Sequence, residues 1–149
     1  MAGSVKIETT FTLTYPDGST RKLAKTATVT NLSDLESSEI AIAASATNII
    51  WDPTVEATER MASFDFLALI SDGILDVEFT ANEAHASEEL DTKRLIDAIP
   101  LMLGADDSFY GHTASNAFGG TLDLIDKIRV KEPAAAARRL IIIMGKKSA

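Results

Sequence analysis

The first segment of the chain, residues 5–15, alternates between apolar and polar positions. An extended chain places five apolar residues on one face: Val5, Ile7, Phe11, Leu13 and Tyr15. Lysine, glutamate and threonine occupy the other face, and this pattern is typical of an antiparallel strand buried on one side. The Pro-Asp-Gly-Ser sequence at 16–19 supplies a turn, and the alternation resumes after it. Residues 4–30 are therefore predicted to form a β-hairpin.

The next twenty residues combine signals for a turn and for a strand. Residues 31–39 are polar, and Ser33-Asp34-Leu35-Glu36 has the spacing of a capping box, which predicts a helical turn. Residues 40–51 contain alanines that favour helix, but Ile-Ile-Trp followed by Asp-Pro favours a strand end. We predict a strand over 40–51.

The segment 63–80 carries the strongest β signal. FDFLALI is almost continuously apolar, as expected for a strand covered on both faces, and LDVEFT alternates. The Ser-Asp-Gly sequence at 71–73 lies between them. An Asp-Gly turn between two β-rich runs predicts that these two strands pair as a hairpin.

The segments after residue 80 give mixed signals for secondary structure. Residues 81–91 form an acidic loop or the start of a short helix, and a helical spacing through Leu90 and Arg94 competes with a strand over 95–103. A strand with Leu122, Leu124, Ile128 and Val130 on one face would also bury Asp126, which predicts a bulge near Ile125 and Asp126. The apolar segment 138–144 predicts a closing strand, and 145–149 a frayed tail.

These elements predict an all-β fold with about eight strands and little helix. Many short strands separated by turns, without repeats or a low-complexity linker, are typical of an antiparallel β-sandwich of the jelly-roll type. We expect residues 1–149 to form a single domain of this class, in which the 4–30 hairpin serves as an assembly arm.

The composition limits the classes of partner and of chemistry that fit this chain. A net charge of −8 argues against nucleic acid or an anionic membrane as partner. The chain has no cysteine, which excludes disulfides and thiol chemistry, and no apolar run approaches the ~20 residues of a membrane span. The first residues lack the apolar block of a secretory signal, so we expect synthesis in the cytoplasm.

No catalytic or metal motif emerges from the residue spacing. The two histidines, His85 and His112, lie in polar segments, and His112 with Asp106 and Asp107 matches no compact ligand pattern. The chain also lacks a Gly-x-Ser-x-Gly sequence. We expect no enzymatic activity, no metal and no cofactor.

The long aperiodic segment 104–120 is the main candidate for contact with another molecule. Aromatic residues among Gly, Ser and Asn resemble the composition of contact loops, although they could instead cover one end of the sandwich. Trp51, the only tryptophan, serves either core packing or stacking on a sugar. The candidate contact residues are Phe109, Tyr110, His112, Asn116, Phe118 and Trp51.

From Trp51 onward the order of segments resembles a known family. WDPTVE, FDFLALISDGILDVEFT, IPLMLGADDSFYG, FGGTLDLIDKIRV and ARRLIIIM together are similar to small jelly-roll virion proteins of tailed bacteriophages, the auxiliary proteins that decorate or stabilise the head. The resemblance covers about two thirds of the chain and excludes the 4–30 hairpin.

The resemblance implies a non-enzymatic structural protein of the virion head surface, made in the host cytoplasm. It also implies a homotrimer whose other partner is the major capsid protein. Residues 104–120 would then contact a neighbouring subunit or the shell, and the N-terminal hairpin could be exchanged between subunits by strand addition. The alternative from the residues alone is a receptor- or carbohydrate-binding β-sandwich module of a phage tail appendage, which would use Trp51, Tyr110 or His112.

Overall fold

The computed structural model describes residues 3–53, 61, 63–81, 89–97, 99–104 and 125–147. These residues form nine strands and no helix, which confirms the all-β prediction with one strand more than expected. The strands are β1 (Gly3–Thr14), β2 (Thr20–Ile42), β3 (Thr47–Trp51), β4 (Phe66–Ser71), β5 (Leu75–Ala81), β6 (Glu89–Leu95), β7 (Leu101–Gly104), β8 (Ile125–Lys131) and β9 (Arg138–Lys147).

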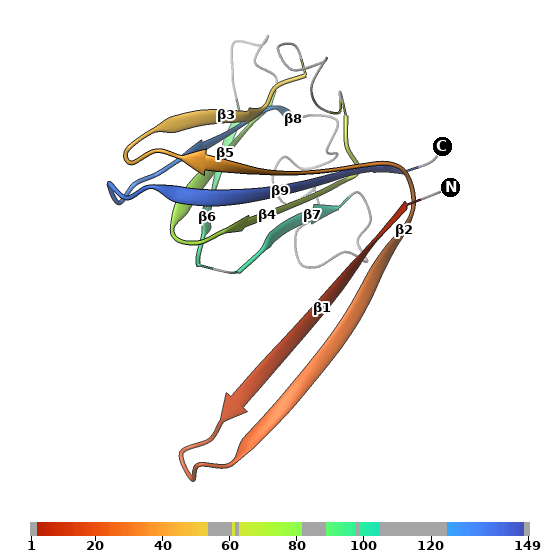
Figure 1. The fold of residues 1–149 in the computed structure, drawn as a ribbon, viewed down its shortest axis with the longest axis vertical. Coiled ribbons are helices and arrows are strands. Elements are labelled where there is room, and N and C mark those ends of the chain that lie inside the picture. The colour runs from red at the N-terminus through yellow and green to blue at the C-terminus, as the bar shows by residue number, and fades with distance from the viewer. Residues whose placement is uncertain are drawn as a thin grey trace.

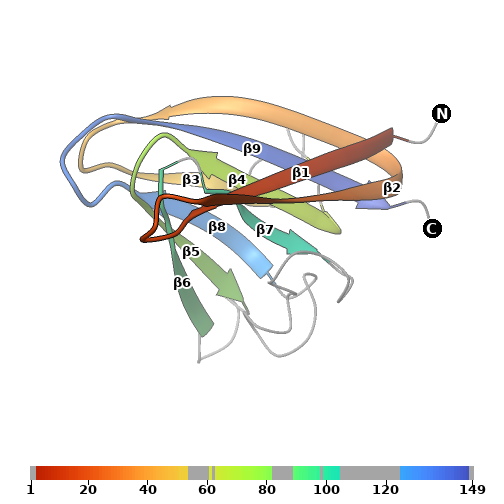
Figure 2. The ribbon, with the colours of Figure 1, turned by 90° about the horizontal axis from the view of Figure 1, so that it is seen from below.

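The strands are arranged in two antiparallel sheets. The five-stranded sheet has the order β1-β2-β9-β4-β7, and the four-stranded sheet has the order β3-β8-β5-β6. In Figure 2, β2 and β9 of the first sheet are seen apart from β5 and β6 of the second sheet. From β2 onward the chain passes from one sheet to the other at every connection except β5 to β6.

The main core lies between the two sheets. Leu67 and Leu69 of β4 and Ile142 of β9 come from the five-stranded sheet, and Phe79 of β5 and Ile128 of β8 meet them from the other sheet. All five side chains are at most 1% exposed. Because each sheet has one face on this core, the two sheets hold each other in place.

The predicted hairpin across Ser71-Asp72-Gly73 is wrong. β4 and β5 are strands, as expected, but β4 pairs with β7 and β9 whereas β5 pairs with β6 and β8. Asp72 binds the backbone of Arg139 instead, with its Oδ1 accepting from the Arg139 N–H at 2.9 Å. The turn therefore carries the chain between the sheets, anchored to the start of β9.

The helical turn predicted at Ser33–Glu36 is also wrong, since β2 continues as a strand to Ile42. There, β9 supplies hydrogen-bond partners for the backbone of residues 32–42, and this ladder prevails over the local capping signal. The strand predicted over 40–51 is interrupted by a turn at 43–46, where Ser45 has a φ of 58°. β3 begins only after that turn.

The later strands lie only partly where they were predicted. β6 begins at Glu89, inside the segment expected to be a loop or a helix start, and the strand predicted over 95–103 is wrong at 96, 97, 99 and 100, which lie outside the named strands; β7 covers 101–104. The bulge is confirmed, because Thr80 pairs with Lys127 and Ala81 with Ile125, which leaves Asp126 between them. Residues 145–147, expected to be frayed, continue β9 and pair with β2.

The buried carboxylate of Glu132 links the β2–β3 turn to the β8–β9 connection at one end of the body. Glu132, which is 1% exposed, accepts the Ser45 N–H at 3.0 Å and the Ala134 N–H at 2.8 Å. Its own N–H donates to Ala46 O at 3.0 Å. The Ser45 N–H and the N–H groups of 134–136 favour the charged form and hold the pKa of Glu132 below its usual value of 4.5.

This lowered pKa predicts how stability depends on pH. A carboxylate whose pKa is lower in the folded state stabilises the fold above its unfolded-state pKa, and this contribution is lost as the pH falls through the folded-state pKa. Glu132→Gln should therefore lower the free energy of unfolding at pH 7 and flatten its decline below about pH 4.5. Urea denaturation from pH 7 to pH 3 measures both. An unchanged acid limb in the variant would contradict the assignment.

Candidate functional site

The β1–β2 hairpin projects away from the two-sheet body as an arm (Figure 1). Its strands pair from Gly3 opposite Leu32 to Thr14 opposite Thr20. Every residue from 11 to 26 is exposed, and this segment is called the distal arm below. No side chain of the distal arm is therefore buried against the described part of the body.

The base of the arm is anchored by a second apolar cluster. Val29 and Leu32 of β2 pack with Phe66 and Ala68 of β4, and the partly buried Ile7 joins them. Phe66 and Ala68 alternate along β4 with the core residues Leu67 and Leu69, so this cluster lies on the face of the five-stranded sheet opposite the main core. That face is called the outer face below.

The junction between arm and body is bent. Asn31 has a φ of 60°, and the pairing register shifts both between Gly3 and Val5 and between Leu32 and Asp34. Bulges increase the local twist and bend the strands that contain them. Asn tolerates the left-handed conformation better than most residues, which explains its presence at this hinge.

At the far end, Tyr15 and Ser19 close the turn. The Tyr15 N–H donates to Ser19 O at 2.9 Å, and Gly18 takes a φ of 82°, which favours glycine. The Ser19 hydroxyl donates to Asp17 Oδ1 at 2.7 Å and, with the Ser19 N–H, holds the pKa of Asp17 below its usual range. The tip of the arm is thus an ordered turn.

The two faces of the distal arm differ in chemistry. Opposed residues in an antiparallel pair share a face, and Phe11 lies opposite Leu23 while Leu13 lies opposite Arg21. The same register places Lys25 on this apolar face, opposite Thr9, whereas Thr12 and Lys22 lie on the other. Phe11 is 60% exposed and Leu23 is 41% exposed. The distal arm thus presents an uncovered apolar strip flanked by two cations, neither of which forms an ion pair within the described part of the chain.

A hollow opens on the outer face of the five-stranded sheet, away from the arm. It measures about 330 Å³ and is called the outer-face hollow below. Its lining is formed by Glu39, Ile70, Ser71, Asp72, Asp97, Arg139 and Ile141. Ile141 is 38% exposed, and Arg139 Nη1 lies 3.5 Å from Glu39 Oε1. Three carboxylates against one guanidinium make this a negatively charged hollow with an apolar floor.

The predicted contact residues are placed only in part. Trp51 packs in the core, where its Nε1–H donates to Met61 O at 2.8 Å. Its ring packs edge-on against the ring of Phe64, with 5.0 Å between the two ring centroids. Core packing is therefore its confirmed use, and at 4% exposure it offers no free face for a sugar. The five other candidates lie outside the described residues: Phe109, Tyr110, His112, Asn116 and Phe118.

Sequence reasoning missed the outer-face hollow, and it placed the apolar side of the arm in a core. The alternation in 5–15 does identify the apolar face, but it carries no signal for whether the body reaches far enough to cover it. Glu39, Asp97 and Ile141 are far apart in the sequence and meet only through the sheet.

Among the residues that the structure describes, no group of three or more His, Asp or Glu side chains could hold a metal ion, and no helix could cross a membrane. Comparison with family models, with curated proteins and with solved structures gives no match to this chain.

The hinge makes a testable prediction. Asn31→Val places a β-branched side chain at a φ of 60° and should lower the free energy of unfolding by about 1–2 kcal/mol. Asn31→Gly, which adopts this φ without strain, should stay within about 0.5 kcal/mol of the parent. Urea denaturation compares them, and equal losses in both variants would contradict a left-handed hinge.

Proposed function

We propose that this chain is a non-enzymatic structural subunit of a bacteriophage virion, which decorates or stabilises the head as a homo-oligomer. The observation that carries the proposal is the distal arm, where Phe11, Leu13 and Leu23 extend an apolar strip into solvent. A two-stranded ribbon is at best marginally stable in water. A ribbon with an uncovered apolar face is therefore suited to binding another protein.

The finer fold is part of this proposal. We assign β2–β9 to the jelly-roll class, in which eight strands form two antiparallel sheets through two Greek keys. The order β2-β9-β4-β7 facing β3-β8-β5-β6 supports the assignment, because successive strands alternate between the sheets except at β5 to β6. Jelly rolls build viral capsid proteins and also lectins, so the fold supports a virion role without specifying it.

The arm complements this body in a way that suits assembly. β1 lies outside the eight-stranded core arrangement and pairs only with β2. Its base is fixed by packing against Phe66 and Ala68, so the distal arm is held out at a defined angle. A surface presented in this way loses little conformational freedom on binding, which favours association.

The proposal predicts two properties of the purified chain. Sedimentation velocity should give a species of about three times the 15.9 kDa chain mass, and this species should co-sediment with empty heads assembled without it. Replacing the distal arm, residues 11–26, with a two-residue turn should abolish the oligomer and weaken binding to heads. Circular dichroism checks that the shortened chain retains its β structure. A monomer at all concentrations that ignores the heads would overturn the proposal.

A further inference from the structure

We infer that the distal arm of one copy docks on the outer-face hollow of a neighbouring copy of the same chain. The contact joins Phe11, Leu13 and Leu23 to the floor formed by Ile70 and Ile141. This inference rests on the homo-oligomer in the proposed function and names the two surfaces that build it.

Charge complementarity points to a second copy as the occupant. Residues 3–30 contain four of the chain's 14 Lys and Arg residues and two of its 22 Asp and Glu residues. The hairpin therefore carries a net charge of +2, and the rest of the chain carries −10. Two arms with a net positive charge repel each other, whereas the arm of one copy is attracted to the acidic body of another copy.

The charges are also placed correctly at the two surfaces. Arg21 and Lys25 share the apolar face of the distal arm with Leu23. In the hollow, Glu39 and Asp97 line the same cavity as Ile141, and Glu39 pairs there with Arg139. Each surface thus has apolar side chains beside charged ones, and the net signs are opposite: two cations on the arm, and three carboxylates against one guanidinium in the hollow. This combination fixes both the face of the arm and its orientation in the contact.

Two further exposed apolar side chains lie close to Asp97 in the sequence. Ile96 and Ile99 are 55% and 58% exposed and are joined by an isolated β-bridge. They add apolar area that a docked arm can cover, and burial of apolar area is the main driving force for association.

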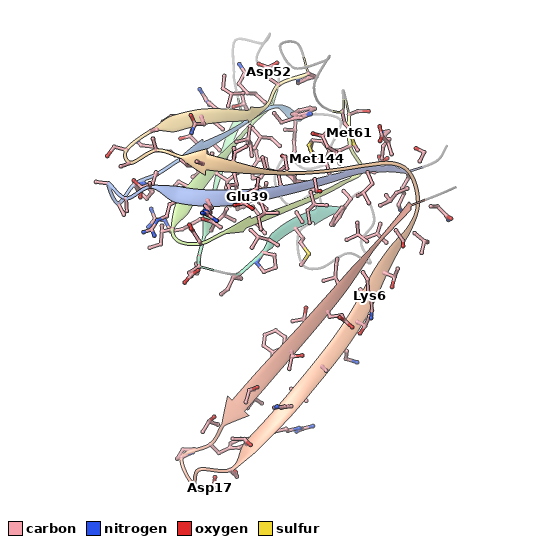
Figure 3. All side chains as sticks on the ribbon, viewed as in Figure 1. Lys6, Asp17, Glu39, Asp52, Met61 and Met144 are labelled. Carbon is pink, nitrogen blue, oxygen red and sulfur yellow. The ribbon has the colours of Figure 1, made fainter. Side chains whose placement is uncertain are left out.

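The arm and the hollow of one chain do not meet. All residues from 11 to 26 are exposed, and in Figure 3 Asp17 marks the tip of the arm while Glu39 lies on the body. The contact is therefore between chains and joins two different surfaces. Such head-to-tail contacts close into rings when the rotation between copies allows it, which fits a cyclic oligomer.

Cross-linking tests the contact directly, because the chain has no cysteine. Leu23→Cys and Ile141→Cys chains, distinguished by a size tag, are mixed and treated with a short bismaleimide. The matched control replaces Leu23→Cys by Ala24→Cys, which lies on the next position of β2 and on the opposite face of the arm. We expect a mixed cross-linked dimer with Leu23→Cys in at least tenfold excess over the control.

Two outcomes would overturn the inference. Equal yields from Leu23→Cys and Ala24→Cys would show that the apolar face of the arm does not approach Ile141. Preferential cross-linking of Leu23→Cys to itself would show that two arms pack on each other. Neither outcome depends on binding to heads.

Charge reversal provides a second readout in the full-length chain. Arg21→Glu with Lys25→Glu should weaken self-association at least about tenfold in sedimentation velocity, and adding Glu39→Lys with Asp97→Lys in the same chain should restore it. Lys22→Glu, on the opposite face, is the control and should have little effect. Failure of the compensating pair to restore association would count against this docking site.

Measuring head binding in parallel separates the inference from the proposed function. Heads that bind the chain although arm and hollow do not cross-link would overturn the inference and leave the virion role intact. A cross-linked oligomer that never binds heads would overturn the virion role and leave the arm-to-hollow contact intact.

Discussion

The long strand β2 has to satisfy its backbone hydrogen bonds against two different partners, and the rest of the structure follows from this constraint. Its first half pairs with β1 and its second half with β9. The change of partner occurs where Asn31 adopts a left-handed conformation and both ladders shift register. One continuous strand therefore fixes the arm to the body, and the direction of the arm is set by backbone geometry at a few residues.

Along the β1–β2 hairpin, the same apolar face is covered at the base of the arm and exposed to solvent farther out. At the base of the arm, Ile7 and Val29 lie against β4 and are covered, whereas Phe11 and Leu23 lie farther along the same face and are not. Between these positions the face carries Thr9 and Lys25, and beyond them the apolar side chains resume out of reach of the body. The apolar surface of the arm thus begins in an intrachain cluster and continues past the body into solvent.

Local patterns predicted the elements with contacts close in sequence, and they failed where distant strands decide the structure. Alternation in 5–15 and the Pro-Asp-Gly-Ser turn identified the hairpin because its contacts are close in sequence. The Asp-Gly signal at 72–73 failed because β4 pairs with β9, whose partners run from Leu140 opposite Ser71 to Gly145 opposite Phe66, and no local feature encodes that pairing. The capping signal at Ser33 failed for the same reason, since β9 supplies the ladder. For the site, the sequence indicated which face of the arm is apolar, but only the fold reveals where the body ends.

The junction in β2 also has a mechanical consequence. A pull on the arm along β2 reaches the body through the β2–β9 ladder, whose pairs run from Leu32 opposite Lys147 to Ile42 opposite Arg138. Load applied parallel to the strands is shared by all these hydrogen bonds at once, so they resist it together rather than opening one after another. Resistance to force is governed by the barrier to unfolding and not by equilibrium stability. A force on the arm would therefore be opposed by the whole β2–β9 ladder rather than by its end pairs alone.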